Sequence, residues 1–297
     1  MPQTAAPCPV ATRRAAGRAP LAALAAAAVL AAAAAPAHAA FVIFESAGAT
    51  PAAITPTRDA FRSQVGGGTV AGVNGSFGGL RREINWDGVP DTLADPNPLP
   101  GDFFNTTSPR GAVLSTPGTG FLVSANAGLA TPPLFGFSSD FQTFSAQRLF
   151  TAVNSDITDV SFFVPGTATA ATTSAFGLIF TDVEVAGGTR LDFFDATNAL
   201  LFSRDALVAV NQGLTFLGAV AGAGERISRV RITSGVNTIV ANGVLGNPSD
   251  DVVVMDDFLY AEPLAPTATP VPEPSGLALV ALGLACAALA RSRRRGG

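Results

Sequence analysis

The stretch LDFFDATNALLFS, residues 191–203, decides the fold class of this chain. Two short apolar segments rich in Leu and Phe flank Ala196-Thr197-Asn198, and Asn readily adopts the positive φ that a tight turn requires. The stretch therefore predicts a β-hairpin. Further along, ISRVRI at 227–232 alternates apolar side chains with arginines, which predicts a strand with one side facing solvent.

The same pattern extends in both directions from the hairpin. Between residues 41 and 262, short runs rich in Val, Ile and Phe alternate with Gly, Asn, Asp, Pro and Thr clusters, and no long helical periodicity is present. Strands are expected at 41–44, 84–86, 121–124, 148–153, 159–164, 176–185, 190–194, 199–203, 214–220, 226–232 and 251–260. This spacing predicts an all-β, antiparallel β-sandwich of jelly-roll type over residues 40–262, with a long loop over 91–117.

The N-terminal segment has the pattern of an export signal. Arg13, Arg14 and Arg18 precede an uncharged run of Leu, Val and Ala at 21–35, which closes on Ala37-His38-Ala39. A charged region, an apolar helix and an Ala-x-Ala site predict a Sec signal peptide over residues 1–39, cleaved after Ala39.

Removal of the leader restricts the chemistry of the mature domain. The one His is His38, Cys8 lies in the leader, Cys286 lies in the tail, and the chain contains no Lys. These positions exclude a disulfide framework, a Ser-His-Asp triad, a Cys-His pair and a His-ligated metal from the domain. The chemistry left to the domain is that of carboxylate, Arg, hydroxyl and amide groups, and we expect a protein that is not an enzyme.

The charge of the domain restricts its partners. Residues 45–273 contain all 22 acidic residues but only 11 of the 18 arginines, which gives a net charge of −11. Such a surface repels nucleic acid and anionic lipid, and it suits hard cations and neutral glycans.

The C-terminal segment has three parts. Residues 263–274, PLAPTATPVPEP, predict an extended spacer. Residues 275–297 then contain an apolar run of 15 residues, 276–290, followed by four arginines, Arg291 and 293–295. Because a stable membrane span needs about 20 residues, this short helix is expected to tether a precursor to the inner membrane only transiently. An ordinary tail anchor is the alternative.

The order Pro272-Glu273-Pro274, apolar helix and arginine cluster resembles the PEP-CTERM sorting signal of Gram-negative bacteria. The resemblance implies that an exosortase recognises these three residues and releases or transfers the protein. It also implies an association with exopolysaccharide or biofilm, and a final location at the cell surface or in the extracellular matrix.

The segment around the one Trp is the first candidate binding site. Asn85, Trp86 and Asp87 belong to INWDGVP at 84–90, which resembles a segment of exported PEP-CTERM-type β-proteins. Trp86 could stack on a sugar whose hydroxyls bond to Asn85 and Asp87. The alternative is a buried Trp that anchors the sandwich before an Asp-Gly turn.

The last strand supplies a candidate metal site. Asp256 and Asp257 interrupt an otherwise apolar run, and the strand resembles the final strand of jelly-roll carbohydrate-binding and concanavalin-like lectin modules. That resemblance implies a structural calcium held by Asp256 or Asp257, with Glu45 on the first strand as partner. Alternatively, one Asp faces solvent and the other caps a turn.

These observations favour a non-catalytic envelope or matrix protein that binds exopolysaccharide. One alternative is a glycoside hydrolase that uses a carboxylate pair, either Asp182 with Glu184 or Asp192 with Asp195. The other is a periplasmic subunit that binds protein.

Overall fold

The structure, a computed structural model, describes residues 40–67, 74–76, 80–222, 224–240, 243–244 and 250–266. The expected leader helix, the C-terminal helix and the sorting residues all lie outside these ranges. Within them, the strands form two sheets, one of nine strands and one of five.

Both sheets are antiparallel apart from one parallel pairing, that of Ile239 with Val153. The larger sheet has the order β1 (Val42–Gly48), β10 (Leu214–Val220), β7 (Ala175–Thr181), β14 (Val254–Ala261), β5 (Phe150–Val153), β12 (Ile239–Val240) and β13 (Gly243–Val244), with β2 (Arg81–Ile84) beside β14 and β4 (Gly120–Val123) beside β5. The smaller sheet has the order β3 (Ala112–Ser115), β6 (Ile157–Phe162), β11 (Arg229–Thr233), β8 (Arg190–Phe194) and β9 (Leu200–Asp205). This arrangement agrees with the predicted all-β sandwich.

The hairpin that the sequence predicts is present. β8 pairs with β9, and Asn198 has a φ of 64° in the turn between them. In β11, Val230 and Ile232 are buried, whereas Arg231 on the opposite face donates to Asp159 at 2.8 Å. The prediction of a strand with one solvent-facing side is therefore also confirmed.

The core lies mainly between the two sheets. Its large buried members are aromatic residues from both sheets: Phe150, Phe162, Phe176, Phe180, Phe193, Phe258 and Tyr260. Because each such ring removes a large apolar area from water, these residues contribute much of the stability of the sandwich.

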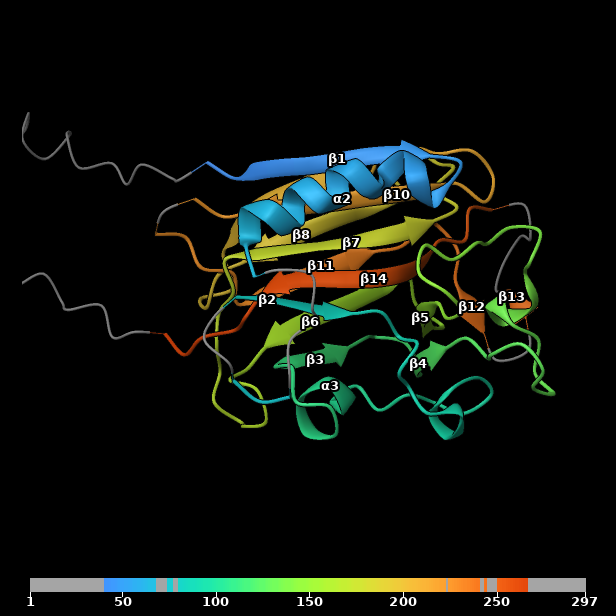
Figure 1. The fold of residues 1–297 in the computed structure, drawn as a ribbon, viewed down its shortest axis with the longest axis horizontal. Helices are drawn as coiled ribbons and strands as arrows, with labels where there is room; N and C mark the ends of the chain where they lie inside the picture. Colours follow the sequence, from blue (N-terminus) through green and yellow to red (C-terminus); the bar gives the residue numbers. More distant parts are fainter. Residues whose placement is uncertain are drawn as a thin grey trace, which may run out of the picture. The chain divides into compact units, whose positions relative to one another are not determined.

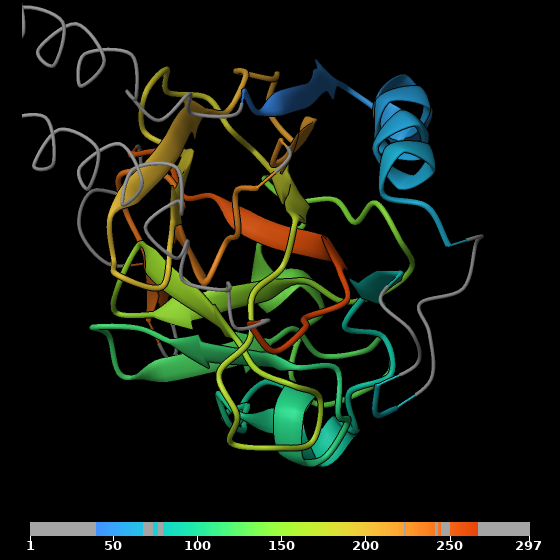
Figure 2. The ribbon, with the colours of Figure 1, turned by 90° about the vertical axis from the view of Figure 1, so that its left-hand side faces the viewer.

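A helix, α2 (Pro51–Val65), corrects the prediction that the domain contains no long helix. It lies against the outer face of the larger sheet, alongside β1 and β10, as Figures 1 and 2 show. Phe61 packs there on Phe44 and Phe216, with ring centroids 5.7 and 5.5 Å apart. Only Ile54 and Phe61 of this helix are buried, and Pro56 lies inside it, so its sequence gives a weak signal for a helix.

The expectation of one long loop over residues 91–117 is also wrong. The segment contains the short helices η1 (Asp91–Leu93) and α3 (Phe103–Thr106) as well as β3. A third short helix, η2 (Leu134–Gly136), and the two-residue strands β12 and β13 were likewise not predicted. Elements of two to four residues are too short to show a period among Pro, Gly, Asn and Thr.

A bulge in β14 shapes the centre of the larger sheet. Along one edge β14 pairs with β7. Met255 pairs with Phe180 and Phe258 pairs with Leu178, so β14 has one more residue between these pairs than β7 has. The other edge of β14 is shared, because β5 pairs with Met255 and β2 pairs with Phe258 and the residues after it. The extra residue of the bulge therefore lies where β14 passes from one partner to the other.

Among the described residues, no helix is both long enough and apolar enough to cross a membrane. The apolar run 276–290 is outside them.

Candidate functional site

Asp256 and Asp257, here called the bulge pair, occupy the bulge of β14. Asp256 is fully buried, and its Oδ2 accepts hydrogen bonds from the backbone N–H groups of Phe144 (2.6 Å) and Ser145 (3.3 Å). The Ser145 hydroxyl lies 2.8 Å from Asp257 Oδ1 and 3.2 Å from Asp256 Oδ1. The loop before β5 thus supplies the donors that a buried carboxylate needs.

The two carboxyl groups of the bulge pair also perturb each other. Burial, together with repulsion from Asp257, raises the pKa of Asp256 well above its ordinary value. Burial likewise raises the pKa of Asp257. Because two adjacent buried carboxylates cannot easily both ionise, the pair retains a proton at pH values where an exposed Asp has lost it.

The structure does not bring Glu45 together with the bulge pair. In the register of the larger sheet, Glu45 on β1 pairs with Leu217 on β10. Leu217 pairs with Leu178 on β7, and Leu178 pairs with Phe258 on β14. Three strand spacings separate Glu45 from β14, about 14 Å. Instead, Glu45 Oε2 accepts a hydrogen bond from Arg204 Nε at 2.8 Å. The expected calcium trio of Glu45, Asp256 and Asp257 is therefore not assembled.

Trp86 lies in the interior, and its side chain supports the bulge. The residue is 1% exposed, its ring stacks on Phe150 with a centroid distance of 4.1 Å, and its Nε1 donates to the Asp256 carbonyl oxygen at 3.0 Å. The ring cannot stack on a sugar from solvent, so Trp86 is the buried anchor that the alternative described. Asn85 is exposed beside it, and Asp87 Oδ1 accepts a hydrogen bond from the Arg148 backbone N–H at 3.2 Å.

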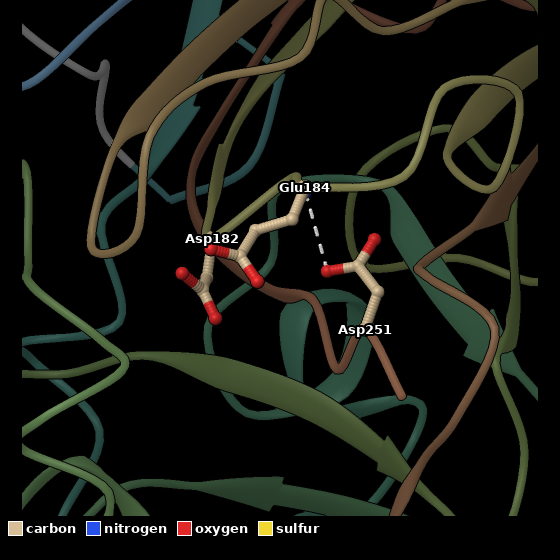
Figure 3. A group of neighbouring side chains, drawn as sticks. All are labelled: Asp182, Glu184 and Asp251. Atoms are coloured by element: carbon tan, nitrogen blue, oxygen red, sulfur yellow. Dashed lines mark hydrogen bonds between the residues drawn. The ribbon is translucent and has the colours of Figure 1, made fainter. Parts of the chain in front are cut away.

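The structure gathers a different set of acids, Asp182, Glu184 and Asp251, which we call the carboxylate cluster. One oxygen from each lies within 4.8 Å of the others. Figure 3 shows the three side chains gathered together. Asp182 and Glu184 follow the end of β7, and Asp251 precedes β14. Because these two strands are antiparallel neighbours, the end of one meets the beginning of the other.

Hydrogen bonds from the backbone hold the carboxylate cluster in place. Asp182 Oδ1 accepts the Gln212 N–H at 2.9 Å. The two oxygens of Asp251 accept the N–H groups of Glu184 (3.3 Å) and Val185 (3.1 Å). Asp182 and Asp251 are 6% and 5% exposed, whereas Glu184 is open to solvent. Main-chain hydrogen bonds therefore hold the two buried carboxylates, whereas the Glu184 carboxylate is accessible to solvent.

The electrostatics of the cluster favour a cation. Burial raises the pKa of Asp182 to about 7, and repulsion from Glu184, Asp251 and Asp140 adds to this effect. Burial, followed by repulsion from Glu184, also raises the pKa of Asp251. In the part of the chain that the structure describes, no arginine forms an ion pair with the three carboxylates. Among the described residues, these carboxylates are thus satisfied by main-chain N–H groups and not by an arginine.

The oxygen-only composition of the cluster selects among metals. Calcium takes about six to eight oxygen ligands and tolerates irregular geometry, whereas zinc and copper favour nitrogen or sulfur. Three carboxylates supply part of a calcium coordination shell, and the exposure of Glu184 leaves the remainder to solvent or to a ligand.

Of the two acid pairs proposed for hydrolysis, only one remains available. Asp182 and Glu184 both belong to the carboxylate cluster. The Asp192 carboxylate accepts hydrogen bonds from the Arg190 guanidinium and, at 2.5 Å, from the Ser203 hydroxyl. The Asp195 carboxylate accepts a hydrogen bond from the Thr197 N–H at 2.8 Å within the β8–β9 turn. The second pair thus has structural roles.

The C-terminal tail can be assigned by comparison with known proteins. A model of the PEP-CTERM protein-sorting motif matches residues 270–295. The chain ends in a PEP-CTERM sorting motif. The motif implies processing by an exosortase, export, and sorting to the envelope or surface of a Gram-negative bacterium. Pro272, Glu273 and Pro274 lie within the matched segment and outside the described residues.

No curated protein and no solved structure matches the chain. The role of the β-domain in this exosortase substrate must therefore be argued from its own residues.

Proposed function

We propose that this PEP-CTERM protein is a non-catalytic component of the cell surface or its matrix, which binds exopolysaccharide through a calcium ion held by Asp182, Glu184 and Asp251. The observation that carries the proposal is the gathering of these three carboxylates within 4.8 Å of one another at one end of the larger sheet.

The physical argument begins with the energy of the buried charge. An ionised carboxylate that is removed from water without a positive partner is strongly unfavourable. Asp182 and Asp251 are both in this position, and a bound divalent cation would compensate them together. The site is suited to calcium because its ligands are oxygens alone.

Glycan binding is proposed because the three carboxylates do not fill every coordination position of a calcium ion. Three carboxylates provide about three to six of the six to eight oxygens that calcium takes. Hydroxyl groups of a sugar can fill the remaining positions in place of water. The net charge of −11 over residues 45–273 disfavours an acidic polymer as direct partner of the surface, so a neutral or cationic exopolysaccharide fits best.

A glycan array with the purified protein tests the proposal. The protein is applied in millimolar calcium and in EGTA, as wild type, as Asp251→Asn and as Asp102→Asn, which changes an exposed carboxylate outside the cluster. For neutral glycans, we expect binding by wild type and Asp102→Asn in calcium alone, and loss of binding in Asp251→Asn. Equal binding of neutral glycans in EGTA, or no binding to any neutral glycan, would contradict the proposal.

One observation favours hydrolysis as the second candidate. Asp182, with a pKa of about 7, lies beside Glu184, and an acid next to a carboxylate is the arrangement that glycoside hydrolases use. Incubation with the bound glycans distinguishes the two functions. Release of new reducing ends by wild type, lost in Glu184→Gln, would replace the binding function with an enzymatic one.

The sorting stage is proposed to pass through a precursor tethered to the inner membrane by the apolar run 276–290. Replacing Glu273 by Ala should prevent recognition of the motif and leave an uncleaved precursor in the inner-membrane fraction, detectable by its larger mass. Thr269→Ala, just outside the matched segment, is the control and should be processed normally. Normal release of Glu273→Ala would contradict a role for the motif in processing.

A further inference from the structure

A cavity of ≈ 500 Å³ has none of the three cluster carboxylates in its lining. Its walls come from four segments: the turn at 95–96, strand β4, the loop at 130–137 and strand β12. This volume falls within the range of small-molecule pockets. The lining combines apolar side chains, Leu122, Phe135, Phe137 and Ile239, with the polar side chains of Asp95 and Thr131.

The backbone of the cavity loop is strained where it supplies an aromatic side chain. Leu134 and Phe135 have φ values of 53° and 56°, in the left-handed region that large side chains disfavour. Such strain persists only where the surrounding structure imposes it, and it concentrates at ligand sites. Here it accompanies the placement of Phe135 in the cavity wall.

Asp95 is the charged group of the cavity. Burial raises the pKa of its carboxyl group. Within the residues that the structure describes, this carboxylate has neither a hydrogen bond nor an ion pair, although the Asp95 backbone N–H donates to the Val123 carbonyl oxygen at 2.7 Å. A partly desolvated carboxylate without a partner attracts a positive group that also has an apolar surface.

We infer that this cavity binds a sugar that carries a protonated amino group. The ammonium group pairs with Asp95, and the apolar face of the sugar ring packs against Phe135 and Phe137. A neutral sugar would leave the Asp95 charge uncompensated, and the acidic domain repels a sugar acid. The inference rests on the proposed glycan binding and names the class of sugar, but it uses residues that the calcium site does not.

The test compares two probes that differ only at nitrogen: a trisaccharide of glucosamine and the same trisaccharide N-acetylated. Calorimetric titration of the purified protein near pH 6, in EGTA so that the calcium site is empty, gives both affinities. Wild type should bind the amino trisaccharide about tenfold tighter or more, because the charge-assisted bond is lost in the acetylated probe.

Substitutions in the cavity test whether the preference for the amino trisaccharide arises from Asp95. Asp95→Asn should bind the two probes equally, and Phe135→Ala should weaken both, whereas Asp102→Asn should behave as wild type. Equal affinity of wild type for the two probes, or a preference that survives in Asp95→Asn, would overturn the inference. Either result leaves the proposed function standing if the array shows calcium-dependent glycan binding. An array without calcium-dependent binding to neutral glycans, together with a retained amino preference, would instead reject the calcium-mediated function alone.

Discussion

The bulge pair and the carboxylate cluster contain the same type of residue in two different settings. Both have buried aspartates whose pKa values are raised by burial. At the bulge, Asp256 accepts hydrogen bonds from the N–H groups of Phe144 and Ser145, and its side chain is fully buried. In the cluster the carboxylates face one another, and Glu184 is open to solvent.

The difference shows that burial of an acid does not by itself indicate a metal. Backbone and hydroxyl donors satisfy the bulge pair, so the pair stabilises the join between β14 and the loop before β5. At the cluster, main-chain N–H groups donate to Asp182 and Asp251, and one oxygen from each of the three carboxylates lies within 4.8 Å of the others. This gathering of three carboxylates is the reason that the calcium ion is proposed at the cluster and not at the bulge pair.

Removal of the Asp256 carboxylate should have the largest effect. Asp256→Ala leaves the partly buried N–H groups of Phe144 and Ser145 without an acceptor, at a cost of about 3 kcal/mol. For a domain of this size the midpoint of thermal unfolding should fall by roughly 6–12 °C. The fall should be the same in calcium and in EGTA. A midpoint within error of wild type would show that the bulge pair is not a structural element.

Calcium should stabilise the protein through the other set of acids. At a hundredfold excess over Kd, wild type should gain about 2.7 kcal/mol in the free energy of unfolding relative to EGTA. Asp182→Asn and Asp251→Asn should lose this gain, while Asp102→Asn keeps it. Thermal unfolding in the two buffers measures the effect. A gain that survives both cluster substitutions would place the metal elsewhere.

The pH dependence should be the smallest effect. Between the ordinary Asp pKa of 3.8 and the raised value of about 7, folded Asp182 retains a proton that the unfolded chain has released. Stability in EGTA should therefore fall as the pH rises through this window, by at most about 1.4 kcal/mol per pH unit from this group. Chemical denaturation at pH 5.5 and 6.5 gives the slope, which should be shallower in Asp182→Asn. An equal slope in the variant would mean that Asp182 titrates normally.

The features that the sequence predicted correctly depend on local patterns. The 191–203 hairpin, the alternating strand β11 and the PEP-CTERM motif are each encoded in a short run of residues. Helix α2 was missed because its apolar residues are few and because Pro56 lies inside it, where proline usually argues against a helix.

The sequence singled out Asp182 with Glu184 as an acid pair, but it did not indicate that Asp251 joins them, because that depends on the order of the strands. Asp182 and Asp251 lie far apart in the sequence and meet only because β7 and β14 are neighbours. The Asp256-Asp257 pattern suggested a metal because a sequence does not show which loop covers a strand. Trp86 had two possible roles, and the depth at which its ring packs, fixed by contacts with Phe150 and Phe258, decides between them.

The most direct test of the account is a calorimetric titration of the purified protein with calcium, comparing wild type, Asp251→Asn and Asp257→Asn. The account predicts one calcium per chain in wild type and in Asp257→Asn, and none in Asp251→Asn. Calcium binding that is retained in Asp251→Asn and lost in Asp257→Asn would contradict it, and would place the metal at the bulge of β14.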